Sequence, residues 1–222
     1  MMKLSHQLLR LMLAFALCCA LPGMAQETDA MERFDIEAFK RDLIKHNGVL
    51  FLPDGTMIHQ FGTSRDGYIE DRTPPQSAYT YRKVFDTQGR LIATTQEFYS
   101  FFTGITKHYD GHGNLIKEEV NDRDQYFSFS IEDLAAKMLA DYKIDIMNAD
   151  NVYKLNRGQN FDPPFYFYQV YFYDLTSPAP DQALIALLVD GTTGEVLHTL
   201  QAHIMEPTSV FNAYLEKMAT TK

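Results

Sequence analysis

The chain has 222 residues, 13% of them aromatic, and a formal net charge of −9 at pH 7. This length is enough for one domain or two small domains with a hydrophobic core. The acidic balance disfavours contact with nucleic acid and anionic lipid, and it favours a basic partner or cell-wall cations. A surface that is acidic only for solubility is the alternative explanation.

Residues 1–25 are predicted to be an export signal. Lys3 and Arg10 supply its basic part, and residues 11–21 supply its apolar part. Gly23 and Ala25 are the small residues that a signal peptidase cleavage site requires. The apolar run is too short to span a bilayer comfortably as a helix. We therefore expect cleavage near Ala25, a mature chain without a membrane span, and a periplasmic or secreted location.

The two cysteines of the sequence, Cys18 and Cys19, both lie in this predicted leader. Lipid attachment at one of them is the alternative to cleavage, but it requires a small residue just before the cysteine, and Leu17 is not small. Cleavage leaves a mature chain without cysteine. Its hydrophobic core must then stabilise it without disulfides.

Residues 26–124 are predicted to form a domain of one helix and several β-hairpins. Asp35 is placed to cap the helix, and Phe34 and Phe39 are spaced as a hydrophobic staple around that cap. The helix is expected to end at Asn47-Gly48. A hairpin with a turn at Pro53-Asp54-Gly55 should follow.

Residues 62–75 are predicted to be an irregular, charged segment. Loops that carry charge and an aromatic side chain are common places for recognition. A solvated connector is the alternative. The polar partner contacts predicted from this segment are Asp66, Tyr68, Glu70 and Asp71.

The middle of the chain repeats itself at a spacing of 24 residues. The pattern of residues 84–92 returns in residues 108–116, with an aromatic-Asp pair, a Gly three residues after the Asp, and a Leu two beyond it. Asp can bond the backbone two residues on, and Gly supplies a positive φ, so each copy predicts a strand, a tight turn and a second strand. Two copies predict an array of antiparallel hairpins that offers a surface for binding.

Four aromatic residues lie between the two copies of this repeat. Strict alternation along a strand would place Tyr99 and Phe101 on one face, and Phe98 and Phe102 on the other. Tyr99 and Phe101 are predicted to be aromatic anchors for a partner, since aromatic side chains dominate the centres of interfaces.

Residues 125–206 are predicted to form a second α+β unit. Ser130 caps a helix in which Asp133 occupies the capping-box position. Residues 165–173 predict a strand with two aromatic faces, and we expect it to be central and covered on both sides, or else to present one face to a partner. Further strands are expected at residues 151–155, 183–189 and 195–203, and an amphipathic helix at residues 207–222.

The repeat at residues 81–120 resembles the short hairpin repeats of the MORN-variant and YD type. Tyr109-Asp110 followed by Gly113-Asn114-Leu115-Ile116 carries the resemblance, and Gly104 stands where a preceding Gly is expected. Many such repeat proteins are antitoxin or immunity-like partners of toxins. The resemblance therefore implies a protein that binds another protein.

Residues 129–203 resemble a PepSY-type domain. The resemblance rests on the capped helix, the aromatic strand, and the stretch Val189-Asp190-Gly191-Thr192-Thr193-Gly194-Glu195-Val196. That family is exported and non-catalytic, and it includes propeptides that restrain proteases. The chain departs from the pattern at residues 156–164 and 177–180, which are expected to lengthen loops.

Candidate chemistry is sparse in this sequence. His108, Asp110 and His112 form the one compact set of residue types that suits a zinc-like ion, but the repeat already accounts for Asp110 as a turn residue. The mature chain has no cysteine nucleophile and no Gly-x-Ser-x-Gly elbow. We expect no catalytic residue, no metal and no cofactor.

The sequence as a whole predicts an α+β fold, with an N-terminal helix and antiparallel hairpin repeats followed by a PepSY-like helix on an antiparallel sheet. The leading functional hypothesis is an exported immunity or inhibitor protein that occludes a toxin or hydrolase in the periplasm. An envelope-associated scaffold and a hydrolase with an unrecognised site are the alternatives.

Overall fold

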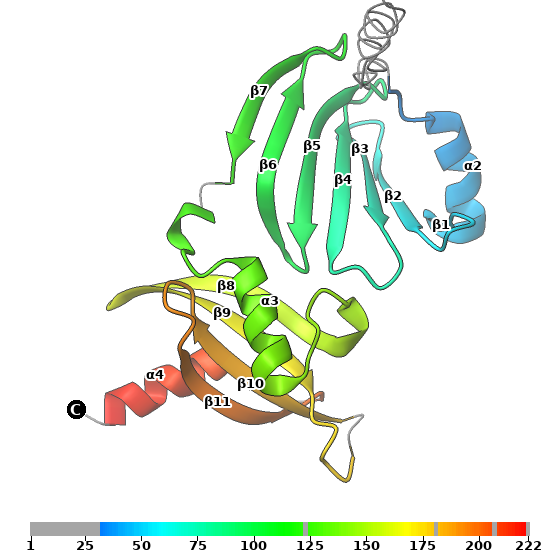
Figure 1. Cartoon of the computed structure of the whole chain (residues 1–222). Coiled ribbons are helices and arrows are strands. Elements are labelled where there is room, and N and C mark those ends of the chain that lie inside the picture. Colours follow the sequence, from blue (N-terminus) through cyan, green and yellow to red (C-terminus); the bar gives the residue numbers. More distant parts are fainter. Residues whose placement is uncertain (1–31, 122–123, 180–181, 206–207, 221–222) are drawn as a thin grey trace, which may run out of the picture.

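A computed structural model describes residues 32–121, 124–179, 182–205 and 208–220. The protein is α+β, and most of it is two antiparallel sheets, one of seven strands and one of four. Figure 1 shows the seven-stranded sheet with α2 at its side, and the four-stranded sheet with α3 on the side that faces the larger sheet. The predicted leader, residues 1–25, lies outside the described residues.

The larger sheet is a meander in which each strand pairs with the next one along the chain, in the order β1-β2-β3-β4-β5-β6-β7. Its strands are β1 (Val49–Phe51), β2 (Met57–Thr63), β3 (Gly67–Thr73), β4 (Tyr79–Phe85), β5 (Leu91–Phe98), β6 (Phe101–Tyr109) and β7 (Leu115–Val120). The helix α2 (Ile36–His46) precedes them, and Asp35 Oδ1 accepts a hydrogen bond from the Ala38 amide at its start.

The sequence repeat corresponds to two equivalent turns, one between β4 and β5 and one between β6 and β7. Asp86 Oδ1 accepts hydrogen bonds from the amides of Gln88 and Arg90 at 2.8 and 2.9 Å. Asp110 Oδ1 does the same with the amides two and four residues on, at 2.8 and 2.9 Å. Both turns place their Gly at positive φ, 75° at Gly89 and 87° at Gly113. The strand–turn–strand prediction is confirmed for each copy.

The prediction of an irregular segment at residues 62–75 is wrong, because residues 67–73 form β3. Gly62 and Gly67 have φ values of 131° and 92° and close a tight hairpin with β2. This polar segment can form a strand because its side chains hydrogen-bond with those of the neighbouring strand. Gln60 Nε2 of β2 donates to Glu70 Oε2 of β3 at 2.6 Å. Such pairing comes from a neighbouring strand and cannot be seen in the segment itself.

One face of the larger sheet packs against α2 and the residues before it. The buried cluster there is Phe34, Phe39, Tyr68, Phe85, Leu91 and Tyr109. Phe34 stacks on Tyr68 with ring centroids 4.8 Å apart, and Phe39 meets Tyr68 edge-on at 5.7 Å. The Asp35 cap starts α2 so that Phe34 and Phe39 both pack in this cluster. Together with α2 they cover this face of the larger sheet.

Two glycines of this sheet allow the cost of backbone strain to be distinguished from the cost of steric crowding. Gly89 and Gly104 both have positive φ, 75° and 69°. A methyl group on Gly89 would lie 2.8 Å from the Phe34 carbonyl oxygen, whereas one on Gly104 would have only Gln96 Oε1 near it, at 4.0 Å. We predict that Gly104→Ala lowers the free energy of unfolding by about 1 kcal/mol, and Gly89→Ala by about 3 kcal/mol because overpacking is added.

Urea unfolding of the two variants measures this difference directly. Each variant keeps its amide N–H, so the comparison isolates the added methyl group. Equal losses of stability in the two variants would show that the Phe34 backbone is free to move away from the Gly89 turn.

The smaller sheet has the strand order β11-β10-β9-β8. Its elements are η2 (Asp124–Tyr126), α3 (Ile131–Lys137), the π-helical turn η3 (Met138–Tyr142), η4 (Ala149–Asn151), β8 (Val152–Phe161), β9 (Pro164–Tyr173), β10 (Ala183–Asp190), β11 (Val196–His203) and α4 (Val210–Thr220). The capping box is formed, with Ser130 Oγ accepting from the Asp133 amide and Asp133 Oδ2 accepting from the Ser130 amide. β8 extends to Phe161, so residues 156–161 are strand and do not lengthen a loop.

The aromatic strand β9 is central and covered on both faces, as expected from its two aromatic sides. It pairs with β8 on one edge and with β10 on the other. Tyr168 and Val170 belong to the cluster on the α3 side, and Phe167 and Tyr171 belong to the cluster on the α4 side. The C-terminal helix therefore packs on its own sheet, with Val210 fully buried there.

The two sheets share one buried cluster. Phe98 and Ala78 of the larger sheet lie in it together with residues of α3, β8, β9 and β10. Two hydrogen bonds to backbone carbonyls support this junction: the Ala78 amide donates to the Met147 carbonyl at 3.0 Å, and the Tyr99 side-chain hydroxyl donates to the Ile146 carbonyl at 2.8 Å. The predicted domain boundary after residue 124 falls in the segment that links the sheets.

The alternation predicted for the aromatic residues at this junction is wrong. Phe98 and Phe101 are directly paired partners of the β5–β6 hairpin and therefore share a face. The chain reverses between them, at Tyr99, whose φ is 52°. Phe102 points to the other side of the sheet. Counting by twos across residues 98–102 fails because a hairpin turn interrupts the strand.

A charged pair closes the junction beside this aromatic cluster. The Arg157 side chain is only 2% exposed, and its Nη1 donates to Asp124 Oδ1 at 2.5 Å. Its Nη2 donates to the Phe102 carbonyl at 2.9 Å. The guanidinium lies between the rings of Phe101 and Phe127, 4.5 and 5.0 Å from their centroids. These contacts join β8 to β6 and to the segment between the two sheets, where Asp124 lies.

Candidate functional site

The larger sheet has a second face, which points away from α2 and from the shared cluster. Side chains alternate along a strand, and Tyr68, Phe85 and Phe98 all point to the packed side. The opposite side chains of β2–β6 define what we call the open face: Met57, His59, Phe61, Ile69, Asp71, Thr73, Thr80, Arg82, Val84, Ala93, Thr95, Glu97, Phe102, Thr106 and His108. Over the described residues, both buried clusters that include this sheet lie on its other side.

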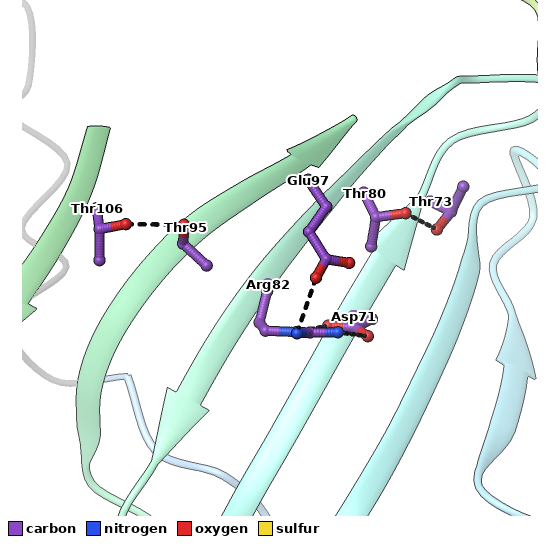
Figure 2. Close-up of polar contacts among 7 residues, drawn as sticks. All are labelled: Asp71, Thr73, Thr80, Arg82, Thr95, Glu97 and Thr106. Carbon is purple, nitrogen blue, oxygen red and sulfur yellow. Dashed lines mark hydrogen bonds and ion pairs between the residues drawn. The ribbon is translucent and has the colours of Figure 1, made fainter. Parts of the chain in front are cut away.

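Arg82 is the centre of the open face, and Figure 2 shows it between two carboxylates from the neighbouring strands. Its Nε and Nη2 donate to the two oxygens of Asp71 at 2.7 and 2.8 Å. Its Nη1 donates to Glu97 Oε1 at 3.0 Å. The hydrogen bonding of Arg82 to the Asp71 carboxylate is the main cause that raises the pKa of Arg82 above its ordinary value. The cation is therefore held in one geometry, and within the described part of the chain the remaining N–H donors of its fork have no acceptor.

Paired threonines border this charged centre on both sides. The hydroxyls of Thr73 and Thr80 lie 2.8 Å apart, and those of Thr95 and Thr106 lie 2.9 Å apart (Figure 2). Each pair joins two neighbouring strands. Thr–Thr hydrogen bonds across strands stabilise a sheet, and the β-branched side chains have few rotamers to lose. The polar middle of the face is consequently ordered before any contact is made.

Aromatic side chains from β2 and β6 lie near Arg82 of β4. The Arg82 guanidinium carbon lies 6.0 Å from the Phe61 ring centroid and 5.6 Å from that of Phe102. His59 packs on Phe61 with ring centroids 5.0 Å apart. Phe102 is 43% exposed, and so it presents a hydrophobic edge to solvent. An ordered arginine among aromatic side chains is the composition found at the energetic centre of protein interfaces.

The six residues predicted as partner contacts are not brought together into one surface. Tyr68 is 3% exposed in the α2 cluster, and Glu70 is 7% exposed on the same side. Tyr99 and Phe101 pack against the shared cluster between the sheets. Asp66 lies exposed in the β2–β3 turn, where it accepts a hydrogen bond from Thr63 Oγ1. These five positions lie off the open face.

Asp71 is the one predicted contact that the open face includes. Sequence reasoning missed its partners Arg82 and Glu97, because no local pattern marks them. The signal that could have found them is the turn at Asp86, which fixes how β4 and β5 pair. Counting back from that turn, with allowance for its bulge, places Arg82 opposite Thr95 and Thr80 opposite Glu97.

Of the three residues weighed as metal ligands, His108, Asp110 and His112, the first two have partners in the sheet and in the turn, and the His112 amide donates to Asp110 Oδ1. His108 Nε2 lies 2.8 Å from Glu119 Oε2. The Asp110 carboxylate is occupied by its own turn, and Asp110 Oδ2 accepts from the Asn114 side-chain amide at 2.9 Å. This bond is the first cause that lowers the pKa of Asp110. In the described part of the chain, no group of three or more His, Cys, Asp and Glu side chains is placed to hold a metal ion.

Comparison of the chain with protein-family models, with curated proteins and with solved structures finds no match. No helix among the described residues is long and apolar enough to cross a membrane. The open face is therefore interpreted from its own geometry. Its charged groups are paired and its aromatic groups flank them, an arrangement suited to contact with another molecule.

Proposed function

We propose that this protein binds a protein partner through the open face and acts as an exported immunity or inhibitor protein. It would neutralise a toxin or hydrolase in the periplasm by covering the partner's surface. The observation that carries the proposal is the ordered Arg82, held between Asp71 and Glu97 and flanked by Phe61 and Phe102. Arginine and aromatic side chains that are rigid before binding lose little entropy on association.

The dimensions of the open face fit this role. Strands β2–β6 at about 4.8 Å spacing, each about seven residues long, give a face of roughly 500 Å². An interface of standard size buries about 800 Å² on each partner. The open face can therefore form the larger part of such an interface, and the turns around it can form the rim.

The charge of the face and of the chain favours a basic partner. Near Arg82 and Lys117 on this side lie three carboxylates, those of Asp71, Glu97 and Glu119. The whole chain carries a formal charge of −9. Such a field speeds encounter with a cationic protein and slows encounter with an anionic one. Capture of a toxin or hydrolase with a basic surface fits these charges.

Affinity capture with the mature chain, from extracts of its own host, tests the proposal. We expect wild type to retain one protein, whose affinity is then measured against two matched variants. Arg82→Ala should weaken binding by about thirtyfold or more, as expected for a hot spot. Lys83→Ala removes the same charge from the next residue of β4, on the opposite face, and should leave the affinity unchanged.

Two results would contradict the proposal. One is equal loss of affinity in Arg82→Ala and Lys83→Ala, because the open face would then have no special part in binding. The other is the absence of any retained protein. Far-UV circular dichroism and a cooperative urea transition of each variant establish that its fold is intact before affinities are compared.

A further inference from the structure

A cavity of about 340 Å³ lies at the junction of the two sheets, on the side of the larger sheet opposite to the open face. Its walls come from β4, β5 and β6 of the larger sheet, from the linker and the start of α3, and from β8 and β9 of the smaller sheet. Ligand pockets of about 300–1,000 Å³ commonly lie at such meetings of two structural units. The cavity is thus large enough for a small ligand or one long side chain.

Several polar groups that line this cavity have no hydrogen-bond partner among the described residues. They are the Tyr79 hydroxyl, the side-chain amide of Gln96 and the Glu132 carboxylate. Burial, and next the Glu132 carboxylate, raises the pKa of Tyr79. Glu132 is also one of the carboxylates whose charge raises the pKa of Tyr168, after burial as the first cause. The carboxylate thus acts on two aromatic walls of the cavity.

The charged groups that line the cavity determine whether it favours a cationic or an anionic ligand. The terminal nitrogens of Arg157 are already engaged, because Nη1 donates to Asp124 and Nη2 donates to the Phe102 carbonyl and to the Asn121 side chain. Its Nε has no partner among the described residues, but that atom is buried and out of reach of a ligand. Asp124 and Arg157 neutralise each other, so Glu132 leaves an excess negative charge. An anion would meet repulsion and no free cation.

We propose that this junction cavity binds an organic cation, an alkyl ammonium or guanidinium group whose charge pairs with Glu132. Its N–H donors would be accepted by the Tyr79 hydroxyl oxygen and by Gln96 Oε1. The rings of Tyr79, Phe127 and Tyr168 offer the aromatic surroundings that favour such cations. The inference does not rest on the proposed function, since these groups and Arg82 lie on opposite faces of the larger sheet.

Titration calorimetry of the mature chain with n-butylammonium tests this site, with butyrate and n-butanol as probes of the same size. We expect n-butylammonium to bind at least about tenfold more tightly than butyrate or n-butanol. This factor corresponds to the contribution of one hydrogen bond to a charged group. Glu132→Gln keeps the shape and removes the charge, and should weaken binding of the cation by about tenfold. Tyr79→Phe keeps the ring and should weaken it by a smaller factor.

The matched control is Glu195→Gln, which removes an exposed carboxylate outside the cavity and should leave the affinity unchanged. Equal binding of butyrate and n-butylammonium, no binding, or equal effects of Glu132→Gln and Glu195→Gln would overturn the proposal. N-acetyl-lysine methylamide distinguishes the two sources of the cation. Tighter binding of this compound than of n-butylammonium indicates a basic side chain of a protein, and equal or weaker binding indicates a free amine.

Discussion

Replacement of Asp124 by alanine should lower the free energy of unfolding by about 3–5 kcal/mol, because it leaves a buried charge without its partner. Arg157 is 2% exposed and loses the one carboxylate that it pairs with among the described residues. The same change removes the acceptor of the Gly104 amide, which lies 2.8 Å from Asp124 Oδ2. Urea unfolding of the mature chain, followed by circular dichroism, measures the loss.

Two further variants identify the cause of this loss. Asp141→Ala removes an exposed partner of Lys137 on the α3–η3 helix and should cost less than about 1 kcal/mol. Asp124→Ala combined with Arg157→Met removes both charges and should regain most of the stability, since a buried ion pair is often replaceable by apolar residues. A double variant as unstable as Asp124→Ala would show that hydrogen bonds, and not the unpaired charge, dominate.

Replacement of Phe98 by alanine should cost about 3–5 kcal/mol, because it opens a cavity where the two sheets meet. Phe98 is 0% exposed. Its ring lies 4.8, 5.0 and 5.8 Å from the rings of Tyr79, Tyr99 and Phe101. We expect one cooperative transition in wild type and a transition at lower urea concentration in the variant.

Phe102→Ala is the matched control for this prediction. Phe102 belongs to the same hairpin but lies on the open face and is 43% exposed, so its truncation should cost less than about 1 kcal/mol. Equal losses in the two variants would mean that the open face is buried to the same degree as the junction. A small loss in Phe98→Ala would mean that the junction collapses around the cavity.

The parts of the fold that the sequence predicts are those that one short segment determines. The Asp86 and Asp110 turns, the Asp35 cap and the Ser130 capping box each depend on bonds within about five residues. The aromatic strand β9 is similar, since two aromatic faces in one segment already require cover on both sides. These features are all present in the structure.

The parts that the sequence does not predict depend on which strands become neighbours. From its own segment, Glu70 is predicted to be an exposed contact. In the structure its carboxylate accepts hydrogen bonds from Gln60 and Arg72 on the packed side of the sheet. Arg82 reads as an ordinary surface residue until Asp71 and Glu97 are known to lie beside it. The candidate site therefore required the register of strands whose contacting residues lie 11 and 15 positions apart in the sequence.

The meander order of the larger sheet has a consequence for how the protein could grow. Every strand from β1 to β7 pairs only with strands that are next to it along the chain. Such neighbour-only pairing keeps loop-closure costs low and lets the sheet assemble progressively. A duplicated hairpin inserted at a turn such as that of Asp110 would replace one strand pair, β6 with β7, by three new neighbouring pairs and would leave every other pair unchanged. Widening of the contact area by tandem duplication is thus open to this architecture at small cost in foldability.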